Sequence, residues 1–148
     1  TQTLQFFFLP ESELALEKLL HTIETAKKSC RVAMYTFTHP KLTSALIDAK
    51  KRGLNVEVVI DAESSRQTSR IAYERLKREK VPVFRSKRTG LLHHKMAIID
   101  DTLVTGSANW TKAAFQYNDD CIAFLSPLTE QEQEKLDRLW KEIRLESK

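Results

Sequence analysis

Residues 91–114 (LLHHKMAIIDDTLVTGSANWTKAA) contain many side chains of the types that can bind ions or take part in catalysis. The polar groups include two adjacent histidines, the lysine that follows them, two aspartates and a glycine-serine-asparagine cluster, namely His93, His94, Lys95, Asp100, Asp101, Gly106, Ser107 and Asn109. Such a set suits three kinds of site: a metal centre, the polar end of an ordinary strand, or a site that processes an anion.

A metal centre is disfavoured by the geometry of the strand that the apolar pattern predicts at 92–99. Neighbouring side chains of a strand point to opposite faces, so His93 and His94 do not converge on one ion. Lys95 shares the face of His93 and places a positive charge beside any cation bound there. We therefore expect no metal ion here, and no other cofactor.

The polar end of a strand is the second interpretation. Apolar residues at 96–99 fall on both faces, which predicts a strand buried on both sides. Imidazole and ammonium groups need partners in such surroundings, so a chance His-x-Lys pair is costly. A single histidine in a strand is still more often structural than catalytic, and we expect this of His94.

A site that processes an anion fits the spacing best. His93 and Lys95 share one face about 7 Å apart, so one can attack phosphorus while the other neutralises an oxygen. Gly106 permits close backbone approach, Ser107 offers a hydroxyl and an amide, and Asn109 offers an amide donor. Together these groups predict a phosphate cradle at the ends of strands.

The same residues resemble a known family. His93-x-Lys95, Asp100 and Gly106-Ser107-x-Asn109 resemble the HKD signature of the phospholipase D superfamily, HxKxxxxD followed by GSxN. The resemblance extends to the flanking segments and so covers essentially the whole chain, whose size is similar to that of the small single-motif bacterial nucleases. Five residues rather than the usual six separate Asp100 from Gly106, which leaves open whether Asp100 or Asp101 is the motif aspartate.

The resemblance implies a metal-independent phosphodiesterase mechanism with a phosphohistidine intermediate. The catalytic residues would be His93, Lys95 and Asn109. Supporting or phosphate-binding roles would fall to Ser107, Gly106, Asp100, Asp120 and His39. Family members bring two motifs together, whereas this chain has one good copy, because His39-x-Lys41 lacks the aspartate and the GSxN that should follow. A homodimer with a shared active site is therefore expected.

Charge distribution favours nucleic acid as the substrate. Residues 75–95 contain eight Lys or Arg residues against one acid, a net charge of +7 within a chain of net charge +4. We expect Arg85, Lys87 and Arg88 to follow a single-stranded polyanion, with Trp110 as a stacking candidate. The alternatives are a phospholipase D acting on cardiolipin or phosphatidylcholine, and a non-catalytic phosphate- or nucleic-acid-binding dimer.

Alternation of β-rich and amphipathic segments predicts an α/β fold, a mixed central sheet with helices on both faces. Strands are expected at 4–9, 31–37, 55–60, 82–85, 92–99, 102–105 and 120–125. Helices are expected at 11–28, 40–52, 64–79 and 127–145. The inward-facing positions of these helices include Leu14, Ile71, Tyr73, Leu76 and Trp140.

The 148 residues suit one domain, residues 1–148, and no apolar run approaches the length of a membrane span. Cys30 and Cys121 are either free thiols or a single disulfide. The first residue is Thr1 rather than methionine, so we expect that a start methionine was removed. Removal of a signal or anchor segment would fit export to the periplasm or membrane anchoring, but the compartment stays open.

Overall fold

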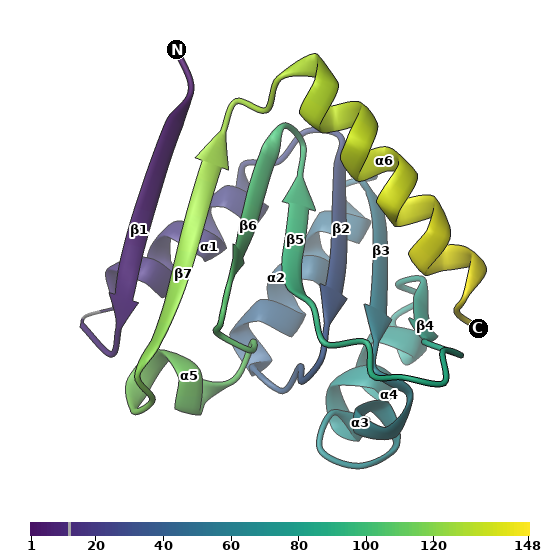
Figure 1. Cartoon of the computed structure of the whole chain (residues 1–148). Helices are drawn as coiled ribbons and strands as arrows, with labels where there is room; N and C mark the ends of the chain where they lie inside the picture. Colours follow the sequence, from purple (N-terminus) through teal and green to yellow (C-terminus); the bar gives the residue numbers. More distant parts are fainter. Residues whose placement is uncertain (12) are drawn as a thin grey trace.

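The computed structural model describes residues 1–11 and 13–148 and contains one mixed β-sheet with helices on both faces (Figure 1). The strands are β1 (Thr3–Leu9), β2 (Ser29–Met34), β3 (Asn55–Ile60), β4 (Val83–Arg85), β5 (Lys95–Ile99), β6 (Thr102–Gly106) and β7 (Asp120–Ser126). The helices are α1 (Leu14–Glu24), α2 (Pro40–Lys51), α3 (Ala62–Arg66), α4 (Arg70–Arg78), α5 (Lys112–Gln116) and α6 (Glu130–Leu145). This α/β architecture confirms the predicted fold class.

The sheet topology brings the polar segment to one end of the strands. The strand order is β1-β7-β6-β5-β2-β3-β4, in which β2, β3 and β4 are parallel and the other neighbours are antiparallel. Because β5 runs antiparallel to β2, the first residue of β5 lies beside the last residues of β2 and β3. This end of the sheet, at the bottom of Figure 1, is the place for a site built from strand ends.

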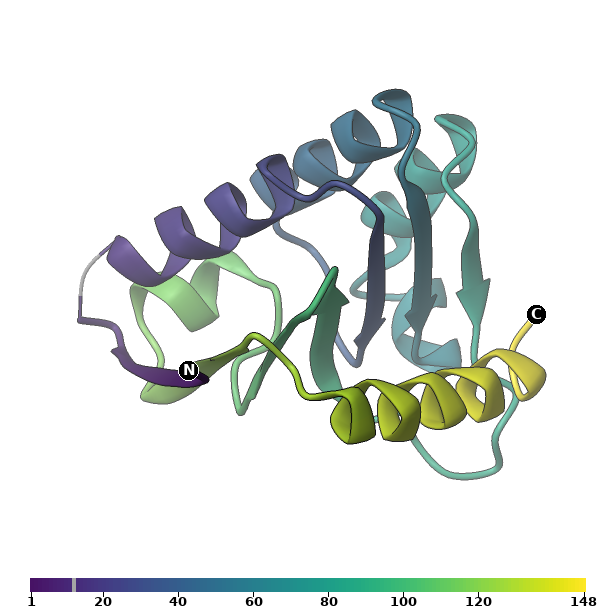
Figure 2. The same cartoon turned by 90° about the horizontal axis from the view of Figure 1, so that it is seen from above.

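Helices lie on both sides of the sheet (Figure 2), and two hydrophobic clusters hold them against it. The larger cluster joins α1, α2 and α4 to one face, where Val32, Val58 and Leu76 are fully buried. On the other face α6 packs Trp140 and Ile143 against β2, β3 and β5. Sequence-local capping fixes where these helices begin, since Pro40 occupies the first turn of α2 and Thr129 forms a capping box before α6.

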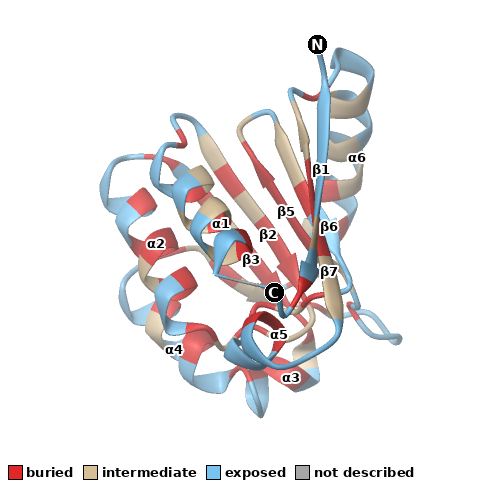
Figure 3. Cartoon of the chain, turned by 90° about the vertical axis from the view of Figure 1, so that its left-hand side faces the viewer, coloured by how far each residue is buried: buried red, intermediate tan, exposed pale blue. Residues whose placement is uncertain are grey.

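The α6 face is covered over only part of its width. Leu4, Phe6 and Phe8 of β1 lie on this face but are 54–66% exposed, and Figure 3 shows β1 largely exposed beside the buried central strands. Phe6 and Phe8 stack on each other with ring centroids 6.2 Å apart. The edge strand therefore presents a contiguous apolar stripe to its surroundings.

Some element boundaries differ from the sequence prediction for identifiable reasons. The predicted helix at 64–79 is two helices, because the Ser69 hydroxyl between them bonds Ser64 at 2.7 Å and accepts the Phe37 backbone N–H at 2.9 Å. The orientation of α4 buries Tyr73 and Leu76 as predicted, but Ile71 is 77% exposed. Tertiary hydrogen bonding by one serine has overridden the helical periodicity.

Other boundaries shift by a few residues. The last helix begins at Glu130 rather than Pro127, because Thr129 caps it, and α1 leaves Leu14 60% exposed. Strand β5 begins at Lys95, not at residue 92, and the short helix α5 was not predicted. Residue 12, part of the predicted helix at 11–28, lies outside the described residues.

The two cysteines are free and far apart within the chain. Strands β5 and β6 separate Cys30 on β2 from Cys121 on β7, which is too far for a disulfide between them. Burial raises the pKa of the Cys30 thiol to about 12, so this cysteine stays protonated. Among the described residues, no helix has the length and hydropathy needed to cross a membrane.

Candidate active site

His93 and Lys95 lie together at the start of β5. The Lys95 ammonium Nζ is 2.8 Å from His93 Nδ1 and 3.2 Å from Nε2, and the Tyr35 ring lies 4.6 Å from the imidazole between ring centroids. Partial burial lowers the pKa of Lys95, an effect that the Asp120 carboxylate opposes. The Lys95 ammonium thus lies within 3.2 Å of both ring nitrogens and keeps a positive charge next to the imidazole.

Asp61 fixes the loop that carries His93 by a hydrogen bond to its backbone. This buried aspartate directly follows β3; its Oδ1 accepts the backbone N–H of Leu92 at 2.9 Å, and its Oδ2 accepts that of Ser64 at 3.2 Å. The backbone carbonyl of His94 accepts a further hydrogen bond from the Tyr35 N–H at 2.9 Å. The residues on both sides of His93 are thereby tied to the ends of β2 and β3.

Replacing Asp61 by alanine should lower kcat about 10- to 100-fold, because the Leu92 N–H loses its acceptor and His93 is no longer held in register. Steady-state kinetics and thermal melting measured together separate this loss of position from unfolding. Glu63→Ala removes an exposed carboxylate two residues away and is the matched control. Wild-type kcat in the Asp61 variant would show that the loop is held by other contacts.

Asn109 approaches the same place from the segment after β6. Its Oδ1 accepts the Thr36 N–H at 3.0 Å, which fixes the orientation of the amide and leaves its NH₂ group for another partner. In the described chain no acceptor for this NH₂ group is found. The segment is anchored through Trp110, whose carbonyl accepts the N–H groups of Thr38 and His39, both at 2.9 Å.

Ser107 has a different role from the one that the sequence predicted. Its hydroxyl donates to Asp120 Oδ1 at 2.6 Å and accepts the Cys121 N–H at 2.9 Å, while its own N–H bonds the Cys121 carbonyl at 3.0 Å. Both donors that were expected to meet phosphate are thus used inside the fold. Ser107 instead orients Asp120, the carboxylate whose charge acts on Lys95.

Gly106 also serves the sheet rather than a phosphate. It has φ +152°, and a Cβ built there would collide with the Cys121 carbonyl oxygen and lie 3.0 Å from the Ile122 Cα. The expected close backbone approach is therefore the approach of β6 to β7.

We expect Gly106→Ala to destabilise the protein by at least about 2 kcal/mol, because backbone atoms of β7 must move. Chemical denaturation of the variant, with Gly90→Ala as the control in open space, measures the effect. Equal midpoints for the two variants would contradict this account of Gly106.

Asp100 is not at the site. It follows the last residue of β5, the end opposite to Lys95, and its carboxylate accepts the backbone N–H groups of Lys27, Lys28 and Ser29 at 2.8–3.0 Å. The carboxylate of Asp101 is exposed and makes none of these bonds, so Asp100 is the structural member of the pair. Phosphate support by Asp100 was a wrong prediction, because the length of the strand separates it from His93.

Two further predictions are corrected by burial. His39 is 3% exposed and caps α2, where its Nδ1 accepts the Lys41 N–H at 3.2 Å, so it does not line a cleft. Burial lowers its pKa, with Lys112 and Lys41 adding to the effect. Trp110 is 1% exposed and packs edge-on against Phe37, so it is not available for base stacking.

The remaining predicted residues lie on the way from β4 to the site. Lys87 is exposed, Arg88 pairs with Glu146 at 3.3 Å, and the Arg85 guanidinium lies 4.0 Å over the Tyr73 ring. His94 is partly buried, and burial followed by the charges of Arg88 and Lys95 lowers its pKa. A neutral, half-buried His94 agrees with the structural role expected of it.

Sequence reasoning missed Tyr35 and Asp61. Tyr35 lies within the strand predicted at 31–37. Asp61 directly follows the strand predicted at 55–60, and a carboxylate at that position is a signal that points to the same sheet end. Within residues 1–11 and 13–148, no three His, Cys, Asp or Glu side chains are grouped closely enough to hold a metal ion.

The comparisons with known proteins bear on the family and the fold of the chain. The family model described as "Cardiolipin synthase, PLD-like domain" matches residues 19–140. The solved structure of Nuc, a phospholipase D family member from Salmonella typhimurium, superposes with a TM-score of 0.89 at 30% identity, over 100% of this chain and 97% of that one. NucT from Helicobacter pylori gives a TM-score of 0.85 at 30% identity, over 99% and 98% of the two chains.

A curated relative is longer than this chain. The mitochondrial cardiolipin hydrolase of Xenopus laevis is 33% identical over 138 residues, which cover 90% of this chain and 65% of the relative, so the chain spans less than two thirds of its length. The family model, the two superpositions and the arrangement of His93, Lys95 and Asn109 point to one origin. The chain belongs to the phospholipase D superfamily.

Proposed function

We propose that the protein is a phosphodiesterase that cleaves single-stranded nucleic acid as a homodimer, without a metal ion. The observation that carries the proposal is the 2.8 Å contact between Lys95 Nζ and His93 Nδ1 at the sheet end that also receives Asn109. The site provides a nucleophile and a positive charge, and a second copy of the chain supplies the remaining proton donor.

In the proposed reaction the neutral His93 imidazole attacks phosphorus, and the bond to the leaving oxygen breaks. His93 of the partner subunit gives its proton to that oxygen. The same partner imidazole then removes a proton from water, which attacks phosphorus and releases the first His93. Lys95 and the free Asn109 amide group of both subunits hold the phosphoryl oxygens as negative charge develops.

The dimer has support in the surface of the chain. A single motif supplies one histidine, whereas the reaction uses two, and β1 leaves its apolar stripe uncovered. Phe8, at one end of the stripe, is paired with Cys121, whose backbone holds Ser107. A second copy packed over the stripe would cover exposed apolar surface.

A lipid substrate is the second candidate. It is favoured by the name of the Xenopus relative and by the exposed Leu4, Phe6 and Phe8, which suit contact with a bilayer surface as well as with a second subunit. A third function, binding without turnover, does not explain why a nucleophilic imidazole is held against an ammonium. Nucleic acid ranks first because the net charge of +7 at 75–95 leads into the site.

The test is a substrate panel in excess chelator. Single-stranded DNA, single-stranded RNA, duplex DNA, and cardiolipin or phosphatidylcholine vesicles are each incubated with wild type and His93→Asn. We expect chelator-resistant cleavage of the single strands that the variant lacks. Turnover of lipid alone would replace the first proposal by the second, binding without turnover would support the third, and an absolute metal requirement would contradict the mechanism.

A further inference from the structure

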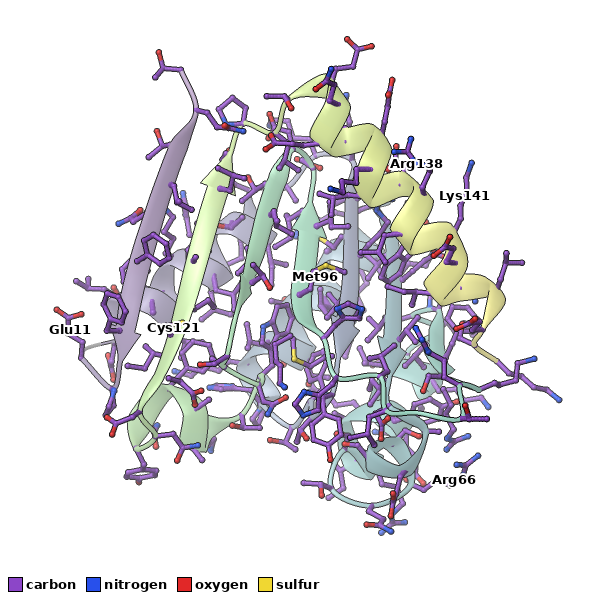
Figure 4. The ribbon with its side chains drawn as sticks, in the orientation of Figure 1. Glu11, Arg66, Met96, Cys121, Arg138 and Lys141 are labelled. Carbon is purple, nitrogen blue, oxygen red and sulfur yellow. The ribbon has the colours of Figure 1, made fainter. Side chains whose placement is uncertain are left out.

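We propose that a basic pocket at the β4 edge of the sheet holds a second phosphate of a single-stranded polynucleotide whose scissile phosphate lies at His93. The inference rests on the proposed nuclease function and deepens it. The pocket has a volume of about 510 Å³, and four of its cationic side chains come from three separate segments, namely Arg66, Lys77, Arg85 and Lys87. It lies at the end of the sheet that carries α3, where Figure 4 labels Arg66.

The charges of the pocket are not neutralised inside the chain. None of the side chains that line it is acidic, and in the described part of the chain none of the four cations forms an ion pair. Arg88, by contrast, lies outside the pocket and is paired with Glu146. Unpaired cations that converge on one hollow favour an anionic ligand.

Arg85 is held in a conformation suited to phosphate. Its guanidinium lies 4.0 Å over the Tyr73 ring, and its Nε donates to the Ser65 hydroxyl at 2.9 Å. Among the described residues the two terminal nitrogens of the fork have no partner. A planar fork fixed by stacking, with its terminal N–H groups unused, binds phosphate in two-point fashion at low entropic cost.

The sheet register relates the pocket to the catalytic lysine. Lys95 is paired with Met34, Met34 with Ile60, and Ile60 with Arg85, so Lys95 and Arg85 stand in one row across four strands. Three strand spacings separate their Cα atoms by about 14 Å. Residues of one row also point to the same face, which places the Arg85 fork and the Lys95 ammonium on the same side of the sheet.

The two positions favour a ligand with several phosphates. A polynucleotide carries a phosphate at every step and can place one at each position, with the exposed Lys87 on the loop between them. Cardiolipin offers only two phosphates, joined by one three-carbon glycerol unit, and the cardiolipin arm of the test separates the two ligands.

The test is the double substitution Arg66→Ala/Lys77→Ala, at two exposed positions, compared with Lys50→Ala/Lys51→Ala, which removes equal charge at the far end of α2. Binding of a fluorescent ten-nucleotide single strand is measured by anisotropy over a range of salt concentrations. Cleavage of that strand is compared with cleavage of a dinucleotide. Cardiolipin vesicles are assayed in parallel.

We expect the pocket variant to bind the ten-nucleotide strand about tenfold more weakly, with a smaller salt slope, and to lose the advantage of the long over the short substrate. The single charge reversal Lys77→Glu should change binding in the same direction. Weaker binding without any cleavage by wild type would support the pocket and contradict the nuclease proposal. If wild type cleaves the strand but the pocket and control variants bind it with equal affinity, the pocket inference is wrong and the nuclease proposal stands. The pocket inference is also wrong if the pocket variant loses cardiolipin turnover as strongly as it loses cleavage of the strand.

Discussion

His93→Asn is expected to lower turnover at least about a thousandfold while the protein still folds and binds substrate. Asparagine has no nucleophilic ring nitrogen, and its amide can still accept a hydrogen bond from the Lys95 ammonium. Substrate turnover, anisotropy binding and thermal melting on the same preparation measure the three quantities. His94→Asn is the matched control. The His94 side chain is partly buried, and its backbone carbonyl, which the substitution keeps, accepts the Tyr35 N–H.

Mixing the subunits tests the shared site directly. If two histidines from different chains act on one phosphate, a mixed dimer of wild type and His93→Asn lacks either the nucleophile or the acid. After full exchange of equal amounts, the activity should fall to roughly a quarter of that of the same total of wild type, because only dimers of two intact chains work. A value of one half would mean that each chain acts alone. Alkaline quenching during turnover should also trap a phosphohistidine at His93.

Asp100→Ala should lower the free energy of unfolding by about 2–4 kcal/mol. Three backbone N–H groups, those of Lys27, Lys28 and Ser29, lose a charged acceptor in this variant. Urea denaturation measures the loss, and Asp101→Ala, which removes an exposed carboxylate at the next position, should remain within about 0.5 kcal/mol of wild type. Equal losses would contradict the assignment of the clamp to Asp100.

A second substitution separates the backbone from the side chain. Asp100 has φ 51°, a conformation that glycine adopts without strain. Asp100→Gly therefore removes the carboxylate but relieves the backbone, and it should be less destabilising than Asp100→Ala. The difference between the two variants is the contribution of the left-handed backbone.

The same clamp gives a pH dependence of known sign. Burial raises the pKa of Asp100, but the hydrogen bonds from Lys27, Ser29 and Lys28 together outweigh it, so the pKa lies below its ordinary value. A lowered pKa in the folded state means that the unfolded state binds the proton more tightly. The stability that Asp100 contributes is complete above about pH 4 and is lost as the pH falls through the folded-state pKa. Asp100→Ala should flatten this acid limb.

The fold, and the proximity of His93 and Lys95 in the candidate site, were predictable because short-range patterns encode them. Alternation of apolar residues gave the strands, and the His-x-Lys spacing placed two reactive groups on one segment. The position of Asp100 was also within reach, since five residues of strand put it about 17 Å from Lys95. The motif was interpreted as one site, although its aspartate belongs to the opposite end of the sheet.

Other features depend on contacts between distant segments. Trp110 is buried because its backbone forms a β-bridge with Phe37. The predicted helix is interrupted at Ser69, whose hydroxyl accepts the backbone N–H of Phe37. Ser107 faces Asp120 only after β6 and β7 have paired. In each case the two partners belong to different segments of the chain, so the periodicity within a single helix or strand contains no signal for the contact.

The two tryptophans lie in different hydrophobic clusters, so each can report by its fluorescence on a different part of the molecule. Trp110 lies in the larger cluster next to Asn109, whereas Trp140 lies in the α6 cluster, where its indole N–H donates to Glu57 Oε1 at 2.8 Å. Trp140→Phe leaves one emitting indole next to Asn109, and Trp110→Phe leaves one on the α6 face. The fluorescence of each single-tryptophan protein then follows substrate binding and subunit exchange separately, without an attached dye.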